Sequence, residues 1–351
     1  MIAREGGRSV SDQMTASFVM PVLNEQEHLA EAVRSVTGQT GLDDWELILA
    51  LGDSRDGTDR IAAELAAAEP RIQVLRNPGS GISRGMNLAL ERATHPVVMR
   101  VDAHSVLPPE YAATAIRTMR QVGAVNVGGR MRASGRTAIE KAVAWAYNSP
   151  GGLGGAIYHT GGDAGPAESA YLGVFDRAAV LAVGGYDETL SRGEDWDLNR
   201  RLIEAGGTVW FEPLLEVVYR PRSSIKAVAK QFHASGRWRG EIIRRLRGGG
   251  PVRYLVPPTL VIALAAGAGL VIFDLATGLQ GATGAWLTAI GLSPFVVYGA
   301  WVASMLTGGN LDGQTRRSLV LVLPTMHLSW GWGCLLGLLF KTQGQNAFRG
   351  R

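Results

Sequence analysis

A chain of 351 residues is long enough for one large domain or two ordinary ones, and its 46 glycines cluster in loops and late apolar segments rather than in low-complexity tracts. The net charge of +4 is compatible with nucleic acid, a membrane surface or a phosphorylated substrate, while the single cysteine, Cys334, excludes an intrachain disulfide. Residues 1–14 form a polar tail with no apolar core, so they are not a signal peptide, and we expect the region that follows them to stay in the cytoplasm.

Predicted strands and helices alternate in the first hundred residues. Apolar runs with strand character occupy four segments, at 17–23, 45–51, 72–75 and 96–101. Helices are expected between them, at 24–36, 58–68 and 81–93. This βαβαβαβ order predicts an α/β fold with a doubly wound, mainly parallel sheet, in which ligands bind beyond the carboxyl ends of the strands.

Acidic residues stand at three of these strand ends, as Glu25, Asp53 and Asp102. A turn cap explains one such carboxylate, but it is a weak explanation for three at one edge of a sheet. Asp102 is followed by Ala103 and His104, which places two metal-ligand types one residue apart. A carboxylate and a neutral imidazole suit Mn²⁺ or Mg²⁺ that carries phosphate oxygens, so we expect a cation site after the fourth strand.

A glycine-rich stretch follows at 151–165, with seven glycines. A loop of this length inside a domain is more often a lid or an acceptor-binding loop than neutral filler. His159 and Asp163 lie within it and have no assigned role.

A further helix is predicted to begin at Glu194-Asp195. Acidic residues are ordinary at the start of a helix, where they complement the exposed backbone N–H groups. A carboxylate can equally act as a general base, and the residues alone leave both interpretations open.

The segment 220–253 is strongly basic, with ten Lys or Arg residues and one acidic residue, Glu241. It directly precedes an apolar tail and contains no nucleic-acid motif. This position favours anionic lipid headgroups or pyrophosphate over nucleic acid, and predicts a basic amphipathic segment at a membrane interface.

The remaining residues, 254–351, contain three uncharged stretches, at about 255–273, 285–306 and 319–340. Each is long enough to cross about 30 Å of hydrocarbon as a helix. Buried helices of a soluble domain are the alternative, but three such runs in under a hundred residues favour a transmembrane region.

Loop charges predict the orientation of this region. The loop 274–284 has no Lys or Arg, whereas Arg316 and Arg317 precede the third stretch, so the positive-inside rule places the N-terminal region and the second loop in the cytoplasm. Three crossings would leave Lys341 and the terminal arginines outside, against that rule. An irregular or re-entrant third stretch would remove the conflict, and His327 within it is either functional or a packing residue.

Four motifs in order carry a family resemblance: 18–25 (FVMPVLNE), 52–58 (GDSRDGT), 102–104 (DAH) and 193–195 (GED). Together they resemble the family 2 glycosyltransferases with a GT-A, Rossmann-like fold. Tyr171-Leu172-Gly173, the stretch 184–188 and the apolar tail resemble, more narrowly, the succinoglycan-type bacterial glucosyltransferases. The resemblance implies a GT-A catalytic domain at 15–219.

The same resemblance implies how a nucleotide sugar is held. Pro21 and Glu25 would line the base pocket, and Asp53 would accept hydrogen bonds from the uracil or the ribose. Arg84 matches an arginine that faces the nucleotide in the family, although a solvated helix residue is the alternative.

The family pattern also implies the reacting groups. Asp102 and His104 would hold a divalent cation on the diphosphate, with His104 standing where the family usually has Asp. Asp195 would be the catalytic base, and Glu194 beside it would bind substrate. Trp196 would stack on a sugar face or pack in the core.

The stretch 231–238 resembles the Gln-x-x-Arg-Trp signature of processive members. Five residues rather than two separate Gln231 from Arg237, so a polymer-threading role is not expected. Contact of Gln231, Arg237 and Trp238 with diphosphate or an acceptor sugar remains open beside the membrane-surface interpretation.

These patterns predict an inverting transfer of a sugar, from UDP-hexose or a related donor, to a lipid-linked saccharide at the cytoplasmic membrane face. The product would serve exopolysaccharide or cell-envelope glycan synthesis. The alternatives are a processive polysaccharide synthase, a membrane-tethered nucleotidyltransferase and a non-enzymatic scaffold.

Overall fold

The computed structural model describes residues 13–153, 156–190, 192–245, 252–308 and 311–340. Most of the predicted polar tail therefore lies outside the described residues. The described chain divides into two compact units. Among the described residues, the head unit comprises 13–132 and 157–219, and the helical unit comprises 133–156 and 220–340.

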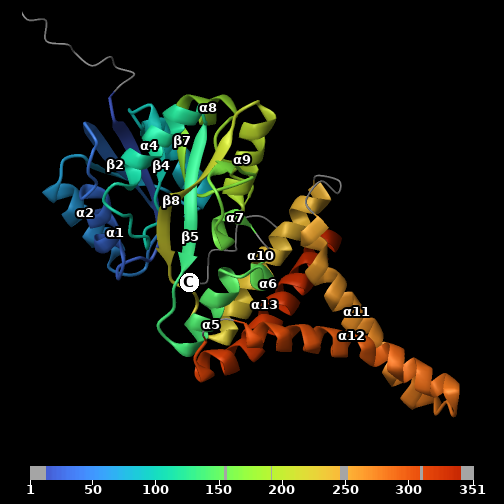
Figure 1. The fold of residues 1–351 in the computed structure, drawn as a ribbon. Coiled ribbons are helices and arrows are strands. Elements are labelled where there is room, and N and C mark those ends of the chain that lie inside the picture. The colour runs from blue at the N-terminus through green and yellow to red at the C-terminus, as the bar shows by residue number, and fades with distance from the viewer. Residues whose placement is uncertain (1–12, 154–155, 191, 246–251, 309–310, 341–351) are drawn as a thin grey trace, which may run out of the picture. The chain divides into compact units, whose positions relative to one another are not determined.

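An eight-stranded sheet forms the centre of the head unit, in the order β3-β2-β1-β4-β7-β5-β8-β6 (Figure 1). Its first half contains the four predicted strands: β1 (Thr15–Val22), β2 (Asp44–Leu51), β3 (Ile72–Arg76) and β4 (Val97–Arg100). These four are mutually parallel. The other half contains β5 (Asn126–Ala133), β6 (Gly165–Pro166), β7 (Tyr171–Asp176) and β8 (Val209–Tyr219). Since β7 runs antiparallel to β4, the parallel order ends beside β4.

Helices cover both faces of this sheet. Successive side chains of a strand point to opposite faces, and in the central strands both sets are apolar and buried. Phe18 of β1 packs in one core cluster, with α1 (Leu29–Thr37), α2 (Thr58–Ala68) and α4 (Tyr111–Val122). Its neighbour Val19 packs in the other cluster, with α3 (Ile82–Arg92), α8 (Arg177–Ala182) and α9 (Glu194–Glu204). The short α7 (Ile157–Thr160) completes the head unit. The predicted doubly wound sheet is confirmed.

The described residues of the helical unit are mainly helical. The unit contains α5 (Ala138–Tyr147), α6 (Pro150–Leu153), α10 (Ile225–Arg245), a short 3₁₀ turn (Val252–Leu255), α11 (Val256–Thr277), α12 (Ala282–Thr307) and α13 (Gly313–Leu339). Three segments are long and apolar enough to cross a membrane: Val252–Thr277, Ala282–Thr307 and Gly313–Leu339. They coincide with the three predicted stretches.

Candidate active site

Three predicted site residues of the head unit follow the carboxyl ends of its parallel strands. Glu25 follows β1, Asp53 follows β2, and Asp102 lies two residues beyond the last residue of β4, Arg100. Since β2, β1 and β4 are neighbours in the sheet, these carboxylates lie along one edge. This is the edge at which doubly wound sheets bind their ligands.

Arg100 joins two motifs that lie far apart in the sequence. Its side chain is 9% exposed, and its Nε donates to Oδ1 of Asp102 over 3.1 Å. Its Nη1 donates to Oε1 of Glu194 over 3.0 Å and also to Oδ1 of Asp195. One buried guanidinium therefore holds the predicted metal ligand and the predicted base at the same place. Charge-assisted bonds of this kind are among the stronger hydrogen bonds in proteins.

Helix α9 carries the predicted base in its first turn. Gly193 precedes the helix with φ +70°, a left-handed conformation that suits glycine and turns the chain into α9. The helix then begins with Glu194, which is buried, and Asp195, whose side chain is 39% exposed. Asp195 is accordingly held by Arg100 on one side and accessible on the other.

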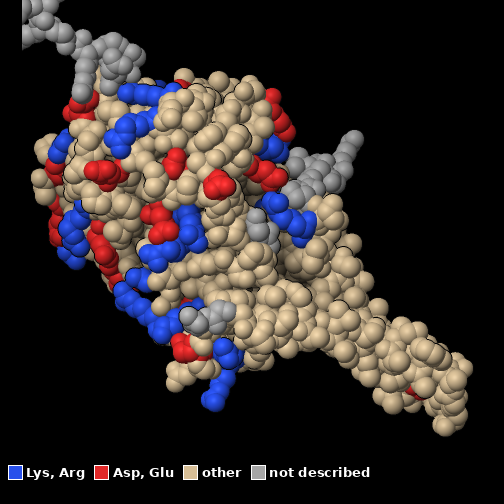
Figure 2. Space-filling model, viewed as in Figure 1, with Lys and Arg blue, Asp and Glu red and all other residues tan. Residues whose placement is uncertain are grey.

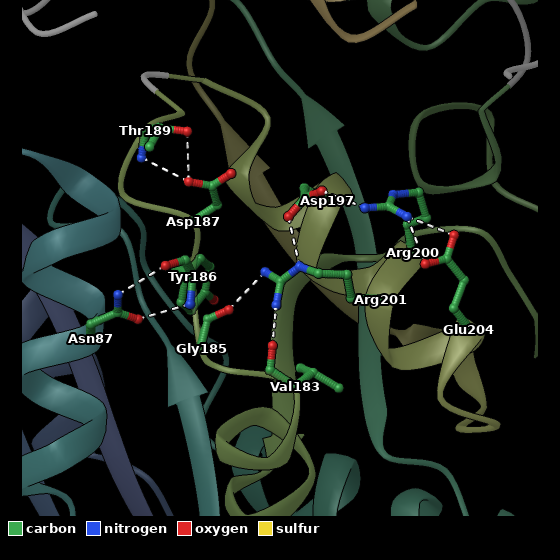
Figure 3. Close-up of polar contacts among 10 residues, drawn as sticks. All are labelled: Asn87, Val183, Gly185, Tyr186, Asp187, Thr189, Asp197, Arg200, Arg201 and Glu204. Carbon is green, nitrogen blue, oxygen red and sulfur yellow. Dashed lines mark hydrogen bonds and ion pairs between the residues drawn. The ribbon is translucent and has the colours of Figure 1, made fainter. Parts of the chain in front are cut away.

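A polar network fixes α9 against the preceding loop (Figure 3). Arg201 donates to Asp197 over 2.8 Å and to the carbonyls of Val183 and Gly185, each over 2.7 Å. The loop is also held from α3, because the side-chain amide of Asn87 bonds both backbone groups of Tyr186. Asp197 is thus a structural carboxylate, which distinguishes it from Asp195 two positions earlier.

The environment of Asp195 raises its pKa to about 6, mainly because the surrounding protein withdraws part of the carboxylate from water, which disfavours its charged form although the side chain stays partly exposed. The positive charge of Arg100 opposes this effect, while the negative charges of Glu194 and Asp102 add to it. A carboxylate with a pKa near neutrality is well suited to accept a proton in a reaction at physiological pH.

Glu25 contacts His104. The carboxylate of Glu25 lies 3.0 Å from Nδ1 of the imidazole, and because a carboxylate only accepts, Nδ1 carries the proton and donates. The backbone N–H of Glu25 donates to Thr58 Oγ1 over 2.8 Å, which holds the residue beside α2. In metal sites, a carboxylate on one ring nitrogen commonly orients a histidine whose other nitrogen binds the ion.

The residues of the predicted cation site are of the donor types that a small divalent ion uses. The described residues contain no group of three or more His, Cys, Asp or Glu side chains arranged around a cation position. Mg²⁺ and Mn²⁺ need fewer protein ligands when phosphate oxygens and water complete the coordination. Asp102, and His104 through Nε2, would supply such a pair, with Arg100 and Glu25 as the groups that orient them.

Asp53 and Arg84 are both exposed on the head unit. Oδ2 of Asp53 accepts from the backbone of Gly79 over 3.2 Å, and its own N–H donates to Ser80 Oγ over 2.7 Å. The loop before α3 is therefore tied to the end of β2. Pro21 is half-buried within β1, and Trp196 is half-buried in α9.

Gln231, Arg237 and Trp238 lie on α10, in the helical unit. Gln231 donates to the hydroxyl of Tyr147 over 3.1 Å, within that unit. Their contact with substrate stays a prediction.

The glycine-rich stretch is partly helical, as α6 and α7, and residues 154–155 lie outside the described chain. His159 is buried, and burial lowers its pKa to about 3, so it stays neutral. Asp163 is exposed. Neither residue gains a role, and a lid at this stretch remains a prediction.

Two residues of the site were not predicted from the sequence. Arg100 is a charged residue at the end of an otherwise apolar strand, and this contrast could have indicated a functional residue in the sequence. Tyr186 is buried close to the acidic cluster, and its pKa is raised by burial, with the charge of Asp195 adding to the effect. No local pattern distinguishes it from a core tyrosine.

Comparison with known proteins identifies the chain's relatives. Residues 17–179 match the model of Glycosyl transferase family 2. The chain is 31% identical over 328 residues to Succinoglycan biosynthesis protein ExoA of Rhizobium meliloti (strain 1021), covering 92% of this chain and 96% of that protein. The mannosyltransferase PcManGT from Pyrobaculum calidifontis, solved with GDP-Man and Mn²⁺, shares the fold with a TM-score of 0.56. At 15% identity, that likeness covers 93% of this chain and 88% of the other. The chain is a glycosyltransferase and belongs to glycosyl transferase family 2.

Proposed function

We propose that this enzyme transfers a hexose, with inversion, from a nucleoside diphosphate sugar to a lipid-linked saccharide at the cytoplasmic face of the membrane. UDP-hexose is the first donor candidate, and the product would enter exopolysaccharide or cell-envelope glycan synthesis. The observation that carries the proposal is the contact of Arg100 with both Asp102 and Asp195. This contact supports a site in which Asp102 would bind the diphosphate through a cation and Asp195 would accept a proton.

The donor would lie along the carboxyl ends of the parallel strands. Asp53 is exposed there and can accept hydrogen bonds from a base or a ribose, and Pro21, Glu25 and Arg84 belong to the same proposed nucleotide site. PcManGT supports a nucleotide sugar at this kind of fold, since it was solved with GDP-Man. The diphosphate would lie by Asp102 and His104, where a bound Mn²⁺ or Mg²⁺ supplies positive charge to the leaving group.

Asp195 would take the proton of the acceptor hydroxyl. As that oxygen forms its bond to the anomeric carbon, the bond from this carbon to the diphosphate breaks, and the proton passes to the carboxylate of Asp195. Attack on the face opposite the leaving group inverts the configuration. Arg100 would hold Asp195 in position without taking the proton itself, because a guanidinium stays charged.

The acceptor proposal depends on the helical unit. Three of its segments are long and apolar enough to cross a membrane, and a soluble acceptor would not require them. The likeness to ExoA, named for succinoglycan biosynthesis, supports a polysaccharide product. Gln231, Arg237 and Trp238 would contact the acceptor or its diphosphate from α10.

The test is an assay of the full chain in lipid nanodiscs, with UDP-, GDP- and TDP-hexoses, Mn²⁺ or Mg²⁺ and a lipid-linked saccharide primer. We expect release of the nucleoside diphosphate, and a product of inverted anomeric configuration by NMR. Release of pyrophosphate, or retained configuration, would contradict the proposal. A single added sugar is expected, whereas a ladder of products would indicate a processive synthase.

A further inference from the structure

We propose that only the α11–α12 hairpin crosses the membrane, and that α13 lies along the membrane surface with α10. Both ends of α13 then face the side of the membrane on which the head unit lies. The partner of this surface is a lipid bilayer with anionic headgroups. The inference concerns membrane contact and is independent of the donor and acceptor proposed above.

The contacts of α13 with the hairpin are the first argument. An added Cβ at Gly331, in the second half of α13, would overlap the backbone carbonyl of Pro257, at the beginning of α11. Trp330 stacks on Tyr254, just before α11, with ring centroids 6.4 Å apart. The second half of α13 therefore lies level with the start of α11. A third crossing that runs antiparallel to α12 would instead bring the end of α13 level with the far end of α11.

Contacts of the middle of α13 with α12 agree with this placement. Nδ1 of His327 lies 2.9 Å from the hydroxyl of Tyr298, in the second half of α12, and the His327 ring lies 5.4 Å from that of Trp301. Nε2 of His327 donates to the carbonyl of Gly152 over 3.2 Å, so α6 also packs at this point. These residues of α12 belong to its end nearest α13, away from the hairpin turn.

The second argument is the packing of α10 against α13. An added Cβ at Gly333 would overlap the carbonyl of His233, and one at Gly337 would overlap that of Arg237. Gly236 and Gly240 of α10 meet the carbonyls of Trp330 and Cys334 in the same way. Residue numbers in these contacts increase along both helices at once. The two helices therefore run parallel, with their backbones in contact. The spacing of four residues on both helices is typical of close helix pairs.

Helix α10 is too charged to accompany α13 through hydrocarbon. Its charged residues with described side chains are Lys226, Lys230, Arg237, Arg239, Glu241 and Arg244. Such residues are strongly disfavoured in the middle of a spanning helix. The Arg239 guanidinium lies 3.9 Å from the centre of the Tyr254 ring, beside Trp330. Tyr, Trp and Arg together are characteristic of a membrane–water interface. Since α13 is fixed to α10, it lies at that interface too.

Burial separates α13 from the other two apolar helices. In the most apolar 18-residue stretch of α13, 39% of the residues are buried. The corresponding shares are 6% for the segment that contains α11 and 11% for α12. Lys141 of α5 lies 3.8 Å from Asp312, just before α13, so a charged residue of α5 also pairs with the residue that precedes α13. The α11–α12 hairpin presents a nearly uncharged surface (Figure 2), and Asp274, its one acidic residue, accepts from Thr288 over 2.6 Å.

The distribution of positive charge agrees with this arrangement. Arg316 and Arg317 lie near the start of α13, and the sequence after it contains Lys341, Arg349 and Arg351. The turn between α11 and α12 has neither Lys nor Arg. A single hairpin places every one of these positive residues on the side of the basic α10. Three crossings would place the last three on the opposite side.

The test is cysteine accessibility in the full chain, in the Cys334→Ala background, which contains no other cysteine. Single cysteines are introduced as Ala67→Cys on α2, Gln280→Cys between α11 and α12, and Gln345→Cys after α13. Intact and disrupted spheroplasts are treated with a membrane-impermeant maleimide. Membrane localisation of each variant confirms that it is inserted, and Cys334→Ala alone sets the background.

We expect Gln280→Cys to label in intact spheroplasts, and Ala67→Cys and Gln345→Cys to label only after disruption. Labelling of Gln345→Cys together with Gln280→Cys, with Ala67→Cys protected, would show that α13 crosses and would overturn the inference. Protection of all three in intact spheroplasts would show that the hairpin does not cross, and would overturn it as well. None of these outcomes depends on glycosyltransferase activity, so failure here is distinct from failure of the proposed reaction.

Discussion

Arg100 and Asp195 lie 95 positions apart in the sequence, yet a guanidinium N–H of the first donates to the carboxylate of the second. The same arginine binds Asp102 over 3.1 Å, so the two acidic motifs of the site share one buried cation. This arrangement leads to predictions about the base, its titration, the cation site and the packing of the helical unit.

Replacing the proposed base tests the proton transfer. Asp195→Asn keeps the shape of the side chain but removes its ability to accept a proton. We expect kcat to fall by about 10²–10⁴-fold, the usual contribution of a general base. Donor affinity, measured by nucleotide titration, should be nearly unchanged. Glu204→Gln, at the exposed end of the same helix, serves as the control, and retained turnover in Asp195→Asn would exclude this residue as the base.

The pKa of Asp195 predicts the acid side of the pH profile. Because only the deprotonated carboxylate accepts a proton, kcat/KM should fall by about tenfold per pH unit below a midpoint near 6, and level off above it. In Arg100→Met the opposing positive charge is lost, so the midpoint should move to higher pH. Arg100→Lys keeps the charge and should stay closer to the original midpoint.

Arg100→Lys and Arg100→Met also distinguish a role of Arg100 in positioning the carboxylates from a role in folding. Lysine cannot donate to three carboxylates in the fixed fork of a guanidinium, so Arg100→Lys should lower kcat more than it changes the donor KM. Arg132→Lys, at an exposed ion pair with Glu216, is a matched control. An unshifted profile in Arg100→Met, with the protein still folded by circular dichroism, would exclude the proposed electrostatic role.

A substitution of Glu25 tests whether this carboxylate orients His104 or binds only the nucleotide base. If Glu25 orients His104, Glu25→Gln should weaken Mn²⁺ affinity by about 10–100-fold, as is usual for groups that orient metal ligands. A role confined to the nucleotide base would leave the metal titration unchanged and affect only the nucleotide. Mn²⁺-dependent binding of a nucleoside diphosphate is the measurement, with the exposed neighbour variant Glu27→Gln as control. Asp102→Ala should remove the metal dependence.

Glycine packing between α10 and α13 predicts a stability difference between two similar substitutions. Gly337→Leu would force a side chain into the backbone of α10 and should destabilise the protein by about 1–3 kcal/mol, the usual cost of overpacking. Gly299→Leu, on α12, meets open space and should be close to neutral. Thermal unfolding in the same detergent compares the two, and equal melting temperatures would contradict tight packing of α10 on α13.

The amino-acid sequence by itself determined the first half of the sheet. Apolar runs predicted β1, β2, β3 and β4 within about two residues, and the acidic residues after three of them predicted the order of Glu25, Asp53 and Asp102 along one edge. It also located the three apolar helices. These features are local, because strand and helix patterns depend on neighbouring side chains and the ends of parallel strands always meet at one edge.

Only the tertiary structure decided which of these groups touch. Arg100 reaches Glu194 and Asp195 because β7 and α9 return beside β4, and Glu25 meets His104 across 79 positions of sequence. The assignment of residues 133–156 to the helical unit, and the contact of α10 with α13, likewise depend on packing between distant segments. Such pairings follow from topology and close approach of backbones, which no periodicity in a single segment encodes.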